Sequence, residues 1–198
     1  MTLDTLRPHL KWIYGPFVDI SIKIGIKPDH FSIASFFVAL FAGIAFYFGE
    51  VALGTFFIMC NAAFDSMDGA VARAMHIQSK RGDFLDHVID RYADIFIITG
   101  IFAGGFAPWP IGVFALTGVF MVSYLGTQAQ AVGVGRYYGG MLGRADRLLL
   151  LIIAGLLTLV YPAGVYGLPF LGWLLVIFGL IGHITAIQRF LFVWKELG

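Results

Sequence analysis

Long runs of apolar residues, separated by short polar or glycine- and proline-rich segments, make up most of the chain. Residues 31–49 contain no charged side chain, and residues 51–64 form a second apolar run. A third predicted span starts around residue 82 and runs to about residue 104, and the stretch 95–135 is uncharged throughout. Because that stretch is too long for one helix, we divide it at residues 104–110, where Gly and Pro cluster. The pattern up to this point predicts four membrane spans, since a helix needs about 20 apolar residues to cross a bilayer.

The last third of the chain adds two more predicted spans. The uncharged stretch 148–182 is divided by residues 162–169, which begin and end with Pro. The start of the chain differs, because residues 3–23 mix Leu, Ile, Trp, Tyr and Phe with a few charges. Such a mixture is typical of an amphipathic helix that lies on the membrane interface. We therefore expect an all-α integral membrane protein with six transmembrane helices, preceded by an N-terminal amphipathic interfacial helix. The predicted organisation is a single membrane domain over residues 1–198, with an interfacial segment at 1–28 and a six-helix bundle at 29–198.

Composition supports the membrane class. Of the 198 residues, 59% are hydrophobic and only 13% are charged, which is too little charge to cover a soluble domain of this length. The formal net charge is +1 and no long basic run occurs, so we expect no nucleic-acid partner.

The placement of basic residues predicts the orientation in the membrane. Lys and Arg occur before the first span, between spans two and three, between spans four and five, and at the C-terminal end. The three other loops contain neither. Because basic loops stay on the cytoplasmic side, both termini and these two basic loops should be cytoplasmic. The predicted location is the cell membrane, with several spans.

Four aspartates follow the second span and open the third. Asp65 and Asp68 are three residues apart and Asp86 and Asp90 are four apart, so each pair shares one face of a helix. The loop between them is short, which makes the two helices antiparallel neighbours and brings both pairs to the same end. Converging carboxylates repel one another unless a cation lies among them. Oxygen ligands suit Mg²⁺, Mn²⁺ or Ca²⁺, so the pattern predicts a divalent metal site.

Glycine and arginine residues beside these acids indicate a phosphate ligand. Gly69 and Gly82 lack side chains and allow a ligand or a backbone to approach closely. Arg73 lies on roughly the same helix face as Asp65 and Asp68, where its guanidinium can hold a phosphate. The chemistry implied is phosphoryl transfer from a metal-neutralised diphosphate.

The segment from residue 65 to residue 90 resembles the signature of the CDP-alcohol phosphotransferase family. The signature is D-x-x-D-G-x-x-A-R, eight residues, then G-x-x-x-D-x-x-x-D. It matches at Asp65, Asp68, Gly69, Ala72, Arg73, Gly82, Asp86 and Asp90. The motif Lys27-Pro28-Asp29-His30 also resembles a Pro-Asn motif of the family, with Asp29 in place of Asn. Residues 140–147 resemble a segment of members that use inositol phosphate, and the chain is most similar in character to phosphatidylinositol-phosphate and archaetidylinositol-phosphate synthases.

The resemblance implies a role for each signature residue. One or two Mg²⁺ or Mn²⁺ ions would be held by Asp65, Asp68, Asp86 and Asp90. Asp90 would also be the catalytic general base for the acceptor hydroxyl. The CDP group would be bound by the signature residues Asp65, Asp68, Gly69, Ala72, Arg73, Gly82 and Asp86. The implied partners are a CDP-linked lipid donor, a small polar alcohol acceptor, membrane lipids and a second copy of the chain in a homodimer.

Cationic side chains near the acids suggest an acceptor that carries its own phosphate. Arg136, Arg144 and Arg147 occupy the second cytoplasmic loop, and Arg91 follows Asp90. We expect Arg144 to bind the acceptor with help from the other three. Inositol phosphate is the favoured acceptor and glycerol phosphate the next, whereas a free alcohol such as serine remains an alternative.

Two functions of other classes compete with this interpretation. Acids on membrane helices also line the paths of divalent-cation transporters. Such a path predicts acids throughout the depth of the membrane, whereas the four aspartates cluster at one end. A membrane scaffold without catalysis leaves four costly acids unexplained.

Overall fold

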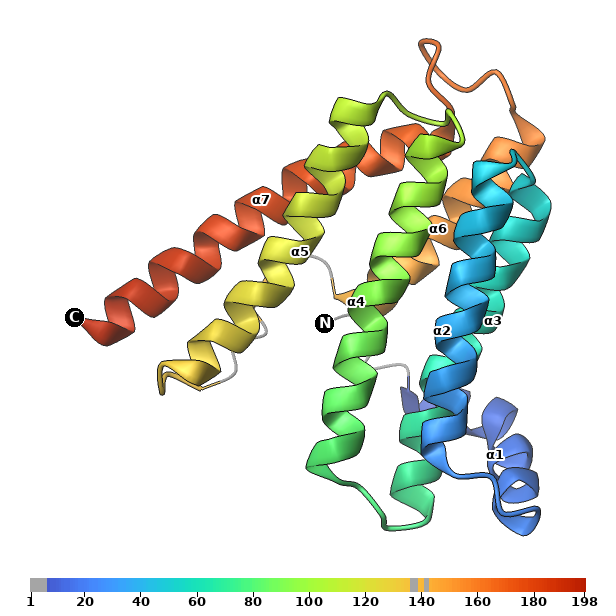
Figure 1. The fold of residues 1–198 in the computed structure, drawn as a ribbon, viewed down its shortest axis with the longest axis vertical. Helices are drawn as coiled ribbons and strands as arrows, with labels where there is room; N and C mark the ends of the chain where they lie inside the picture. The colour runs from blue at the N-terminus through green and yellow to red at the C-terminus, as the bar shows by residue number, and fades with distance from the viewer. Residues whose placement is uncertain (1–6, 136–138, 141–142) are drawn as a thin grey trace.

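The computed structural model describes residues 7–135, 139–140 and 143–198, and this part of the chain contains seven α-helices and no β-strand (Figure 1). The helices are α1 (Arg7–Lys23), α2 (Pro28–Tyr47), α3 (Val51–Ala74), α4 (Lys80–Ala103), α5 (Trp109–Ala131), α6 (Arg144–Val160) and α7 (Phe170–Leu197). The predicted all-α class is confirmed. The predicted interfacial segment at 3–23 corresponds to α1, and its residues 3–6 lie outside the described residues. The predicted acceptor residue Arg136 also lies outside them.

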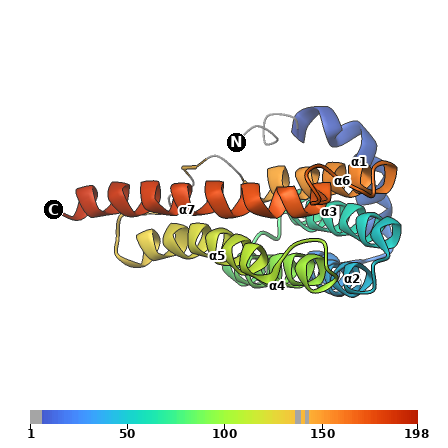
Figure 2. The same ribbon diagram turned by 90° about the horizontal axis from the view of Figure 1, so that it is seen from above.

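The helices pack in two layers. Helices α2, α4 and α5 form one layer, and α6 and α7 lie in the second (Figure 2). Helix α3 packs against both α2 and α6 and so joins the layers, while α1 packs against α3 near one end of the molecule. Helices α5 and α7 pack along each other and lean away from α2 and α3 (Figure 1). The α3–α4 turn lies at the end opposite the α2–α3, α4–α5 and α6–α7 connections (Figure 1).

Local sequence explains where the helices around the site begin. Pro28 stands in the first turn of α2, where its missing N–H leaves no helical hydrogen bond unmade. Ser79 caps α4, because its Oγ accepts a hydrogen bond from the backbone N–H of Gly82 at 3.1 Å. The turn between α2 and α3 contains Gly49 with a φ of +81°, a conformation that favours glycine.

A buried apolar core joins α2 and α4 especially closely. Phe46, Ile97 and Ile101 are almost fully buried in it. Gly43 and Gly100 face each other at the crossing of the two helices, and a Cβ atom on Gly100 would overlap the backbone of Gly43. Small residues therefore set the distance between α2 and α4, and α4 carries two of the four aspartates.

Within the described residues, three helices are long and apolar enough to cross a membrane by length and composition, namely α2, α5 and α7. The other three predicted spans also form helices, at the predicted places, but polar residues distinguish α3 and α4 and a shorter length distinguishes α6. Helix α3 continues beyond the predicted end at residue 64 and includes Asp65 and Asp68. Helix α4 carries charged residues through its first half, and α6 has only 17 residues. Since the acidic site occupies α3 and α4, the same residues that form the site lower the apolar character of these helices.

Candidate active site and metal centre

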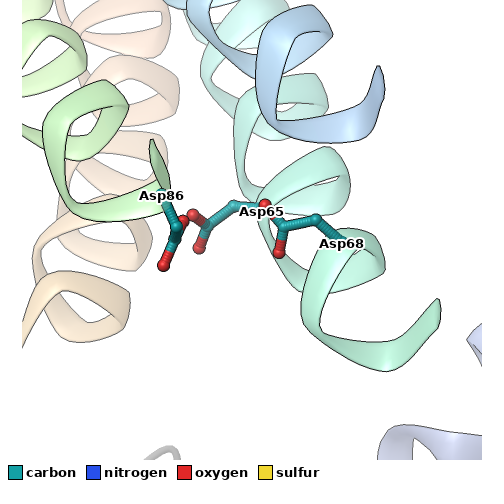
Figure 3. Close-up of side chains that lie close together, drawn as sticks. All are labelled: Asp65, Asp68 and Asp86. Carbon is teal, nitrogen blue, oxygen red and sulfur yellow. The ribbon is translucent and has the colours of Figure 1, made fainter. Parts of the chain in front are cut away.

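Three of the four predicted metal ligands converge between α3 and α4. Asp65 and Asp68 lie on α3 and Asp86 lies on α4, and their carboxylates face one another (Figure 3). One oxygen of each carboxylate lies within 4.8 Å of the other two. The turn of only five residues between α3 and α4 brings the ends of both helices together, as the sequence predicted.

Asp90 lies outside this group of three, one helical turn further along α4. It is buried, with 9% of its surface exposed. Its Oδ1 is 2.5 Å from Nη1 of Arg144, and its Oδ2 is 3.6 Å from Nη2 of Arg91. The fourth predicted ligand therefore has cationic side chains as its neighbours and connects the acids to a second, basic cluster.

The three converging carboxylates fit a small divalent ion. They provide only oxygen donors, and Asp68 is buried while Asp65 and Asp86 are half-buried. Anions this close together and partly removed from water are costly without a cation among them. Mg²⁺ and Mn²⁺ prefer such oxygen ligands. Asp65, Asp68 and Asp86 would hold the ion, which would neutralise the charge of a bound diphosphate.

Asp68 is held in place by two hydrogen bonds. The hydroxyl of Ser32 on α2 donates to its Oδ2 at 2.7 Å, and the backbone N–H of Gly69 donates to its Oδ1 at 2.5 Å. Ser32 was not among the site residues predicted from the sequence. The only sequence signal for it is its position in α2, two residues after the Lys27–His30 motif.

A cavity of about 420 Å³ opens beside the acids. Its size suits a small-molecule ligand. It is lined by all four residues that were predicted to contact the nucleotide in addition to the acids, namely Gly69, Ala72, Arg73 and Gly82. Asp68 and Asp86 form part of the same wall, whereas Ser32, Lys27 and Asp29 line it from α2 and the segment before it. The cavity thus joins the acids to the rest of the signature.

Gly69 lies close to the guanidinium group of Arg73. An added Cβ would lie 3.0 Å from Nη1 of Arg73, so the guanidinium lies directly over this glycine. Arg73 is in the last turn of α3 and faces the cavity. This arrangement leaves its planar group available to a phosphate, which guanidinium groups bind through paired hydrogen bonds.

The predicted acceptor-site arginines are placed differently from one another. Arg144 is the first residue of α6 and forms an ion pair with Asp65 as well as with Asp90. Arg147 lies deeper and donates a 2.7 Å hydrogen bond to Asp94, with both side chains buried. Arg91 lies between these groups, 3.8 Å from Asp94. Of the described arginines, Arg144 bridges the acids of α3 and α4.

Sequence comparison identifies the class of protein to which this site belongs. The chain belongs to the CDP-alcohol phosphatidyltransferase family, whose profile matches residues 26–188. It is therefore a membrane enzyme of phospholipid synthesis that acts on CDP-linked donors, and the transporter interpretation is set aside.

The chain is similar over almost its full length to several inositol-phosphate enzymes. It is 34% identical to the archaetidylinositol phosphate synthase of Pyrococcus horikoshii, covering 94% of each chain. It is 32% identical to the enzyme of the same name from Methanothermobacter thermautotrophicus, covering 98% of this chain and 95% of the relative. A phosphatidylinositol phosphate synthase from Streptomyces avermitilis is 30% identical over 96% of this chain and 81% of the relative.

Solved structures share the fold. The phosphatidylinositol phosphate synthase of Mycobacterium tuberculosis with CDP-DAG bound matches with a TM-score of 0.78 at 23% identity, over 90% of this chain and 92% of that one. A second crystal structure of that enzyme, in complex with manganese and citrate, has the same TM-score and identity over 90% of this chain and 88% of that one.

Proposed function

We propose that this enzyme transfers a phosphatidyl-type group from a CDP-linked lipid to a hydroxyl of inositol phosphate and releases CMP. The position of Arg144 carries the choice of acceptor. This cation lies against Asp65 and Asp90, beside the acids that face the donor cavity. A phosphorylated acceptor needs such a group, whereas serine or free inositol gives it no phosphate to bind. The relatives from Pyrococcus, Methanothermobacter and Streptomyces bear names of inositol-phosphate synthases, which supports the same choice.

Each signature residue takes a role in this proposal. Asp65, Asp68, Asp86 and Asp90 hold one or two Mg²⁺ or Mn²⁺ ions, and Gly69, Ala72, Arg73 and Gly82 shape the CDP site. The acceptor hydroxyl oxygen attacks the β-phosphorus of the donor, and the bond from that phosphorus to the bridging oxygen breaks. CMP leaves with the bridging oxygen. Asp90 takes the proton of the hydroxyl, since an alcohol attacks poorly until a base removes its proton.

We also propose how the enzyme is arranged in the membrane. One domain over residues 1–198 spans the cell membrane six times, with α1 on the interface, and the active site faces the cytoplasm. The enzyme acts as a homodimer. The distribution of basic residues supports this orientation, because the α3–α4 turn is flanked by Arg73, Lys80 and Arg81.

An acceptor panel tests the proposed activity. The purified chain is reconstituted with a radiolabelled CDP-lipid and Mn²⁺, and inositol phosphate, glycerol phosphate, free inositol and serine are supplied in turn. Inositol phosphate should give a lipid product with stoichiometric CMP, and Asp86→Asn should abolish it by removing a metal ligand. Product from glycerol phosphate alone would reassign the acceptor within the same mechanism. Product from serine alone would contradict the role of Arg144.

A further inference from the structure

One nitrogen atom of Arg144 connects the acids of two helices. Its Nη1 forms an ion pair with Oδ1 of Asp65 on α3 and lies 2.5 Å from Oδ1 of Asp90 on α4. Its Nη2 lies 3.5 Å from Oδ1 of Asn61, which is fully buried. The guanidinium is itself almost enclosed, with 11% of the side chain exposed. Arg144 therefore makes its contacts with the same carboxylates that are proposed to hold the metal.

A divalent ion and Arg144 compete for these oxygens. Two cations held on one carboxylate repel each other, and this repulsion is strong where water is largely excluded. An ion bound by Asp65 and Asp90 must therefore displace Nη1 from at least one of them.

The displacement of Arg144 changes the balance of charges around it. Three arginines (Arg91, Arg144 and Arg147) meet three aspartates (Asp65, Asp90 and Asp94) through the ion pairs that link α3, α4 and α6. When an ion takes over Asp65, Asp90 or both, Arg144 loses one or both of its carboxylate partners. A largely buried cation that loses a carboxylate partner is costly and attracts an anion.

We infer that metal binding makes the anion site of the acceptor, by releasing Arg144 from Asp65 and Asp90 to bind the acceptor's phosphate. This inference rests on the proposed function, which assigns a phosphorylated acceptor to the site. It adds a linkage: the metal strengthens binding of the anion, and by thermodynamic reciprocity the anion strengthens binding of the metal by the same factor. The acceptor phosphate then binds well only to an enzyme that already carries its metal.

Metal binding without any substrate gives the first test. Mn²⁺ affinity is measured by calorimetry on the full chain in detergent micelles, for the wild type and Arg144→Gln. Removal of the competing cation should tighten Mn²⁺ binding by about tenfold or more, since each 1.4 kcal/mol of interaction corresponds to a factor of ten. Arg144→Lys keeps the charge and should stay near the wild-type affinity. Arg73→Gln is the matched control, because Arg73 lines the donor cavity and its loss removes the same charge.

The second test uses sulfate, a tetrahedral dianion like a phosphate monoester. Sulfate binding to the wild type should be stronger in the presence of Mn²⁺, and this enhancement should fall by about tenfold or more in Arg144→Gln, on the same energy scale. If the enhancement persists in Arg144→Gln, sulfate binds the metal directly and the inference is wrong. It is also wrong if Arg144→Gln leaves Mn²⁺ affinity unchanged or weaker, or if Arg73→Gln tightens it equally. These binding results do not depend on the acceptor panel, so the proposed function and this linkage can fail separately.

Discussion

Replacement of Ser32 by Ala tests whether α2 positions a metal ligand on α3. Ser32 donates its 2.7 Å hydrogen bond to Asp68 across 36 residues of sequence, and both side chains are buried. Without this bond, Oδ2 of Asp68 loses its donor and the carboxylate is free to rotate away from Asp65 and Asp86. The bond from Gly69 remains, since it comes from the backbone.

The expected magnitude depends on the kind of bond that is lost. A buried hydrogen bond to a charged group contributes about 1.5–3 kcal/mol, which corresponds to a loss of Mn²⁺ affinity of about 10- to 100-fold. Groups that orient metal ligands typically change metal affinity over the same range of about 10–100-fold. Turnover at saturating Mn²⁺ should change much less, because the ion restores the orientation of Asp68 once it is bound.

Calorimetric Mn²⁺ titration, together with turnover as a function of Mn²⁺ concentration, measures both effects. Ser35→Ala is the matched control, because Ser35 is a buried serine one turn deeper in α2. Its backbone carbonyl accepts a 2.9 Å hydrogen bond from the side chain of Asn61, which the substitution retains. An unchanged Mn²⁺ affinity in Ser32→Ala would refute the reasoning. An equal loss in Ser35→Ala would assign the effect to general damage of α2.

Four further outcomes are expected. Asp90→Asn should lower turnover by a factor of about 100 or more while calorimetry shows near-normal CDP-donor binding; loss of donor binding in proportion to turnover would make Asp90 only a metal ligand. Arg144→Ala, assayed at saturating Mn²⁺, should raise the KM of the acceptor more than that of the donor, and equal changes would indicate a structural role. Gly100→Ala should lower the free energy of unfolding by about 1–3 kcal/mol through overpacking against α2, and an unchanged Tm would contradict the close crossing. Gln78→Cys in a Cys60→Ser background should react with a membrane-impermeant thiol reagent only from the cytoplasmic side, and labelling from outside would reverse the proposed orientation.

The sequence determined the features of this protein that depend on local pattern. Apolar runs of sufficient length predicted the helices, because backbone hydrogen bonds inside a bilayer must be satisfied within a helix. Spacings of three and four residues predicted that Asp65 and Asp68 share a face, and the short loop before α4 predicted that Asp86 joins them. These inferences hold because a helical hairpin with a short turn leaves little freedom to its facing residues.

Only the tertiary structure decided the contacts that connect distant helices. Asp65 and Arg144 are 79 residues apart, and their ion pair depends on how α6 packs against α3. The hydrogen bond from Ser32 to Asp68 depends in the same way on the packing of α2 against α3. The sequence grouped Arg147 with Arg144 as an expected acceptor residue, and only the structure shows its ion pair with Asp94 within the bundle. Residues three apart lie on one face of a helix by local geometry. The residue that each of them contacts on another helix depends on how the helices pack together, and the packing of side chains throughout the bundle decides this.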